Sequence, residues 1–174
     1  MINLLDFSKK LFASLLVVIA LPTLAIAGGH SSGLSGDDYV GVTFWIISMA
    51  MVASTVFFIV ERDRVSSKWK TSLTVSALVT LIAAVHYFYM RDVWVATGES
   101  PTVFRYIDWL LTVPLLMIEF YFILAAVTTV SVGIFWRLLI GTVVMLVGGY
   151  MGEAGMVSVM TGFIIGMIGW LYIL

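Results

Sequence analysis

One apolar stretch of this sequence, residues 104–119, carries three ionisable side chains: Arg105, Asp108 and Glu119. On insertion scales each costs at least ~2.5 kcal/mol near the centre of a bilayer, so such residues usually face the interior of a helical bundle and act there. An interfacial ion pair or snorkelling explains Arg105 as well as a functional role does. Those explanations are weaker for Asp108 and poor for Glu119, which has no cation nearby in sequence.

The spacing of the two carboxylates predicts a proton relay. Eleven residues separate Asp108 from Glu119, which is about three helical turns, so both lie on one helix face roughly 16 Å apart along the axis. One carboxylate then lies on each side of the bilayer midplane. Arg105, one turn before Asp108, favours the ionised form of that carboxylate, whereas apolar surroundings favour the protonated form of Glu119.

Three further side chains are candidates for a role near Asp108. His86 lies late in the preceding apolar segment, at a depth comparable to that of Asp108. A histidine satisfied by packing is one interpretation; a His86–Asp108 pair with coupled titration is the one we favour. Thr112, one turn from Asp108, can hydrogen-bond that carboxylate or the backbone. Trp109 is either a lipid-facing ring or a wall of a binding pocket, and spacing alone leaves both open.

The composition indicates what surrounds these residues. The chain has 174 residues, of which 61% are hydrophobic and 11% are charged, whereas soluble domains are about one quarter charged. We therefore predict an all-α membrane protein with the lipid bilayer as its surroundings. A net charge of -1 provides no basic surface for nucleic acid. With no cysteine and only two distant histidines, no metal site is expected.

Five apolar segments are long enough to cross a bilayer: 40–60, 71–90, 104–127, 134–152 and 156–174. The connection 61–70 carries four Lys or Arg residues, and the positive-inside rule places it in the cytoplasm, with the N-terminus outside. Glycines four residues apart, Gly148 with Gly152 and Gly162 with Gly166, predict close packing of the last two segments rather than a dimer motif.

The sequence supports one prediction for each end of the chain. Residues 1–27 are typical of a secretory signal peptide, with Lys9 and Lys10 before a short apolar run and small residues before a cleavage site. Residues 28–39 would then be an exported tail; an uncleaved anchor helix is the alternative. The last segment runs to Leu174 without a polar flank, so we expect the chain to be a fragment of a longer protein.

Several motifs resemble those of the proteorhodopsins, the bacterial light-driven proton pumps of the microbial rhodopsin family. They are FFIVERDRV at 57–65, KWKTSLTVS at 68–76, PTVFRYIDWLLTVPLL at 101–116 and GEAG at 152–155. The third is highly specific, and the resemblance covers nearly the whole chain after the signal peptide. It implies a seven-helix bundle around all-trans retinal, of which the first five helices are present, in a bacterial inner membrane. It also implies assembly as a homo-pentamer or hexamer.

The resemblance also implies a role for each site residue. Asp108 matches the counterion and primary proton acceptor, Glu119 the cytoplasmic proton donor, His86 the partner of the counterion, and Arg105 the arginine that tunes it. The residues at positions that line the retinal pocket in the family are Trp109, Thr112, Leu116, Met145, Gly149, Phe163 and Met167. A leucine at the position of Leu116 implies absorption of green light.

The family attaches retinal through a Schiff base to a lysine of its seventh helix, and this sequence departs from that pattern. Its lysines are Lys9, Lys10, Lys68 and Lys70, none of which can serve. As given, the chain is expected not to pump, whereas the complete protein is expected to be a light-driven outward proton pump, which is a transporter and not an enzyme.

A sensory photoreceptor that signals to a membrane partner is the alternative, although Glu119 argues against it. A proton-coupled transporter without a chromophore is a third reading, and Asp108 disfavours a chloride pump.

Overall fold

The computed structural model describes residues 35–174, and this part of the chain is helical throughout, without strands. Its α-helices are α2 (Tyr39–Glu61), α3 (Lys70–Thr97), α4 (Thr102–Val127), α5 (Val132–Glu153) and α6 (Val159–Ile173). A 3-10 helix, η1 (Ser67–Trp69), leads into α3. The predicted signal peptide, 1–27, and most of the predicted exported tail lie outside the described residues.

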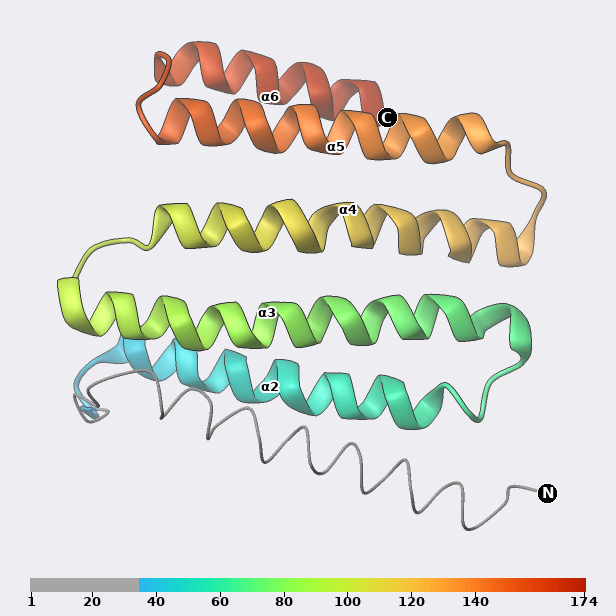
Figure 1. Ribbon diagram of the computed structural model, residues 1–174, viewed down its shortest axis with the longest axis horizontal. Helices are drawn as coiled ribbons and strands as arrows, with labels where there is room; N and C mark the ends of the chain where they lie inside the picture. The colour runs from blue at the N-terminus through green and yellow to red at the C-terminus, as the bar shows by residue number, and fades with distance from the viewer. Residues whose placement is uncertain (1–34) are drawn as a thin grey trace.

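The helices run up and down in chain order, each antiparallel to the one before it (Figure 1). Among the described α-helices, each packs only on its neighbours in sequence, so the layer does not close on itself. Four helices, α2 to α5, are long and apolar enough to cross a membrane, and α6 is a shorter apolar helix of 15 residues. The prediction of an all-α membrane bundle is confirmed.

Helix α3 extends beyond the predicted boundary at residue 90, because the first residue that breaks the helix is Gly98. This glycine has a φ of 68°, in the left-handed region that a C-terminal cap requires. The indole of Trp94, in the last turn, donates to Asp38 Oδ1 at 3.1 Å. Asp38 also caps α2, since the Gly41 N–H donates to the same oxygen at 2.9 Å. This contact fixes the start of α2 against the end of α3.

The last two helices pack through their glycines, as the four-residue spacing predicted. A Cβ placed on Gly162 would lie 2.5 Å from Gly152 Cα, and one on Gly148 would lie 2.8 Å from the backbone nitrogen of Gly166. Backbones approach this closely only where side chains are absent. Ser158 starts α6 later than the expected residue 156, because its hydroxyl caps the first turn.

Candidate functional site

Asp108, the first carboxylate of the predicted relay, is buried between α3 and α4. Asp108 is only 3% exposed, and its Oδ1 lies 3.6 Å from Nδ1 of His86. The same nitrogen is 2.9 Å from the carbonyl oxygen of Ile82; since a carbonyl only accepts, Nδ1 carries the hydrogen. Within the described part of the chain, Asp108 Oδ1 has no hydrogen-bond partner. The structure thus brings the two side chains together and leaves a buried acceptor available to a donor.

Glu119, the second carboxylate of the predicted relay, also faces α3. The hydroxyl of Ser76 donates to Glu119 Oε1, and Ser76 lies toward the opposite end of α3 from His86. Because one helix contacts both Asp108 and Glu119, the two carboxylates lie on the same face of α4, roughly 16 Å apart by helical rise. Thr112, between them, donates to the backbone carbonyl of Asp108 at 2.9 Å rather than to a carboxylate.

The structure pairs Arg105 with a carboxylate other than Asp108. Its guanidinium forms an ion pair with Glu153 at the end of α5 and lies 5.2 Å from the ring centroid of Trp109. Thr102 also donates to Glu153, at 3.3 Å. No ion pair between Arg105 and Asp108 is present in residues 35–174. Sequence reasoning missed Glu153, whose position just before the turn at Gly155 marks the same end of the bundle as Arg105.

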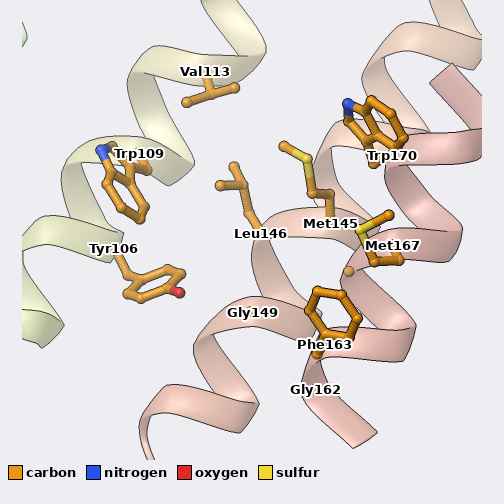
Figure 2. A pocket seen from close by; sticks show the side chains of 11 residues that line it. Tyr106, Trp109, Val113, Met145, Leu146, Gly149, Gly162, Phe163, Met167 and Trp170 are labelled. Carbon is orange, nitrogen blue, oxygen red and sulfur yellow. The ribbon is translucent and has the colours of Figure 1, made fainter. Parts of the chain in front are cut away.

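An apolar pocket of about 560 Å³ opens between α4 and the α5–α6 pair (Figure 2), and neither Asp108 nor Glu119 is among its lining residues. Its walls are Tyr106, Trp109, Val113, Met145, Leu146, Gly149, Gly162, Phe163, Gly166, Met167 and Trp170. The volume is within the roughly 300–1,000 Å³ of small-molecule pockets. Aromatic rings from α4 and α6 stand on opposite sides of the pocket.

Five of the seven residues expected to contact a cofactor line this pocket: Trp109, Met145, Gly149, Phe163 and Met167. Thr112 and Leu116 are not among the lining residues; Thr112 is buried, and Leu116 is 42% exposed. Of the open alternatives for Trp109, the pocket wall is the one observed.

Sequence reasoning did not predict the other six lining residues as cofactor contacts: Tyr106, Val113, Leu146, Gly162, Gly166 and Trp170. A signal for three of these exists in the helical period, since Tyr106 and Val113 lie three before and four after Trp109. Trp170 lies three residues after Met167 in the same way.

Residues 38–174 match the sequence profile of the family described as bacteriorhodopsin-like protein. The chain belongs to this family. The bacteriorhodopsin-like chain is 62% identical over 165 residues to the green-light absorbing proteorhodopsin of Gamma-proteobacterium EBAC31A08, and the match covers 95% of this chain and 65% of that relative. It is 59% identical to the blue-light absorbing proteorhodopsin of Gamma-proteobacterium Hot 75m4, covering 95% of this chain and 64% of that one. The chain therefore spans a little under two thirds of the length of these relatives.

Solved structures of this family share the fold. The crystal structure of the blue light-absorbing proteorhodopsin from Med12 superposes with a TM-score of 0.71 at 60% identity, covering 78% of this chain and 65% of that one. Xanthorhodopsin, described as a light-driven ion pump with dual chromophore, superposes with a TM-score of 0.65 at 30% identity, covering 77% of this bacteriorhodopsin-like chain and 60% of the other. The four spanning helices and these relatives make the chain a multi-pass membrane protein.

Proposed function

We propose that this chain forms part of a light-driven outward proton pump that uses all-trans retinal. The observation that carries the proposal is the pair of carboxylates on one face of α4, each in contact with a different side chain of α3. An aromatic pocket between α4 and the α5–α6 pair adds to it. Light as the energy source is supported by the names of the relatives, which are green-light absorbing, blue-light absorbing or light-driven.

The residues present fit retinal in two respects. The pocket is apolar, and aromatic rings and methionines form its walls, which suits a long, flat hydrocarbon. Asp108 Oδ1 is a buried acceptor without a partner in residues 35–174, which suits a nearby cationic donor. Trp109, Met145, Gly149, Phe163 and Met167 would hold the group. The lysines described, Lys68 and Lys70, lie at the opposite end of α3 from His86 and line no part of this pocket. When bound, retinal supplies the absorption of light and a change of shape.

We assign the proton steps on this chain to the two carboxylates. Asp108 accepts a proton at its free Oδ1, and the nearby Nδ1–H of His86 stabilises the charge that it carries before accepting. Glu119 gives up its proton from the other side of the midplane and regains one from the aqueous phase nearest its own end of α4. Since the first carboxylate lies toward the N-terminal side and the second toward the loop 61–70, net movement is outward.

Arg105 would act on Asp108 through its positive charge, without forming an ion pair with it. Arg105 precedes Asp108 by three residues, and Glu153 and the ring of Trp109 hold its guanidinium. We propose that Glu153 sets how strongly Arg105 tunes Asp108.

The orientation proposed is N-terminus outside, in a bacterial inner membrane. Five of the seven Lys and Arg residues in 35–174 lie toward the end formed by the α2–α3 and α4–α5 connections: Arg62, Arg64, Lys68, Lys70 and Arg137. The positive-inside rule places that end in the cytoplasm. Assembly as a homo-pentamer or hexamer is proposed on the resemblance to proteorhodopsins, and the mass of the protein in native membranes tests it.

Light-driven acidification is the direct test of the proposal. The gene product, read to its stop codon, is expressed in a bacterial host supplied with all-trans retinal, and the pH of an unbuffered suspension is followed under light. We expect acidification that a protonophore abolishes and that Glu119→Gln slows. A retinal-dependent visible absorption without any pH change would indicate the sensory photoreceptor instead. Absence of visible absorption would favour a proton-coupled transporter without a chromophore.

A further inference from the structure

Tyr106 forms the part of the pocket wall that bridges α4 and α5. It is buried, at 7% exposed, and its ring reaches from α4 toward Gly149 of α5 (Figure 2). A Cβ placed on Gly149 would lie 3.1 Å from the Tyr106 hydroxyl oxygen, which is closer than an ordinary contact. Gly149 therefore leaves the room that the phenol occupies, and the position of this ring limits the pocket on this side.

The hydroxyl of Tyr106 donates to the carboxylate of Glu153, at the end of α5. The ring packs against the rings of Trp109 and Tyr150, with centroids 5.1 and 5.2 Å away. Ring contacts tolerate a range of arrangements, whereas a hydrogen bond requires its donor at a defined distance and angle. Glu153 is therefore the group that fixes where the far end of the Tyr106 side chain lies.

Glu153 receives its donors from one face of α4. Thr102, Arg105 and Tyr106 lie at positions i, i+3 and i+4 of that helix, and all three contact the carboxylate. They do not depend on it equally. The side chains of Arg105 and Glu153 are 32% and 39% exposed, so water can replace their ion pair. Tyr106 is buried, and a buried donor that loses its acceptor bears the cost of desolvation.

We propose that Glu153 is a positioning residue of the pocket, which holds the Tyr106 phenol against Gly149 and so sets the shape of chromophore that the pocket admits. The consequence for retinal rests on the proposed function; the position of the ring does not. Without the carboxylate the phenol would turn toward another acceptor, and the space open to it is the pocket that it lines. The pocket would then discriminate less between a straight polyene and a bent isomer of it.

The position of the ring is tested without retinal and without light. The gene product read to its stop codon is made without retinal, with ¹³C at Cζ of its tyrosines, and is studied by solid-state NMR in lipid bilayers. Tyr106→Phe identifies the Tyr106 signal by its loss. A phenol that donates to a carboxylate has its Cζ signal downfield of one that does not. Glu153→Ala should therefore move the signal upfield, and Glu153→Gln, whose amide carbonyl is a weaker acceptor, should give a smaller shift in the same direction.

Retinal then tests the consequence for the pocket. All-trans or 9-cis retinal is added to the same protein, and the rate at which visible absorption appears gives the preference for the straight isomer. Hydrogen bonds to charged groups are the stronger class in proteins, and their lower range corresponds to about a tenfold change in rate. We expect Glu153→Ala to reduce the preference by roughly tenfold. Tyr106→Phe should reduce it similarly, since the ring remains without its donor, and Glu153→Gln should retain most of it.

Thr102→Val is the matched control, because it removes another donor to the same carboxylate, at 3.3 Å, and keeps Tyr106. The control should leave both the Tyr106 signal and the isomer preference unchanged. An unmoved signal in Glu153→Ala overturns the proposal, and so does an equal shift in Thr102→Val or a moved signal with an unchanged preference.

Should Glu153→Ala fail to fold, the presence or absence of the smaller shift in Glu153→Gln decides. A Tyr106 signal that moves as expected, in a protein that forms no visible absorption with either isomer, would keep the contact between Tyr106 and Glu153. That outcome would reject retinal as the cofactor, and with it the proposed function.

Discussion

Two glycines of α6, one turn apart, should respond in opposite ways to the addition of a methyl group. A Cβ on Gly162 would lie 2.5 Å from Gly152 Cα and 2.8 Å from the carbonyl oxygen of Gly148. A Cβ on Gly166 would lie 3.4 Å from the carbonyl oxygen of Met145, which is an ordinary contact. The atoms crowded by Gly162→Ala are backbone atoms of α5, so they cannot move aside as a flexible side chain would.

The magnitudes follow from two competing terms. Alanine gains roughly 0.5–1 kcal/mol over glycine inside a helix, through lower backbone entropy in the unfolded chain. Overpacking a tight contact costs about 1–3 kcal/mol. Gly166→Ala should therefore be neutral or stabilising by up to ~1 kcal/mol. Gly162→Ala should be destabilising, by up to ~2 kcal/mol once the helix term is subtracted.

Reversible unfolding in mixed micelles, followed by circular dichroism, measures both free energies of unfolding in one membrane-mimetic system. Gly169→Ala provides a second crowded case, since its Cβ would lie 2.5 Å from the Met145 backbone nitrogen. The reasoning is refuted if Gly162→Ala and Gly166→Ala have equal effects, or if Gly166→Ala is the more damaging of the two.

Three further perturbations have defined outcomes. Hydrogen bonds, first from a backbone N–H of α2 and then from an indole, hold the pKa of Asp38 below its ordinary value. The ionised Asp38 side chain therefore contributes its full stabilisation above the unfolded pKa of about 3.9, and this stabilisation is lost as pH falls through the lower folded pKa. Asp38→Asn should show a smaller loss of unfolding free energy on acidification than wild type. A double-mutant cycle of Arg105→Gln and Glu153→Gln, measured by free energies of unfolding, should give a coupling free energy below ~1 kcal/mol. The reason is that these two side chains are 32% and 39% exposed. Thr55→Val and Thr80→Val should each cost about 1 kcal/mol in denaturation, with the double variant costing less than the sum.

The sequence was sufficient to predict the helices and one contact between two of them. Apolar length, charge placement and the position of the turn residues predicted α2 and α4 to within a residue or two. Equal depth on neighbouring antiparallel helices was enough to suggest that His86 meets Asp108, because both residues lie near the same end of their segments. The glycine spacing likewise predicted the α5–α6 contact.

Two other contacts between side chains far apart in sequence were not predicted. Ser76 and Glu153 are ordinary residues in their own helices, and only the packing of α3 and α5 against α4 brings them to Glu119 and Arg105. One turn of spacing made Arg105 a candidate partner for Asp108, but a long flexible side chain reaches another element as easily as its own helix. Local spacing therefore selected Arg105 and Glu119 as candidate residues but did not assign their partners.

The central claim is that Asp108 accepts the transported proton, and one variant tests it most directly. Asp108→Asn in the gene product read to its stop codon, supplied with all-trans retinal, removes the acceptor while keeping the volume of the side chain. The light-induced acidification of the medium should disappear in this variant although visible absorption by the bound retinal remains. Acidification at the wild-type rate in Asp108→Asn would contradict the account.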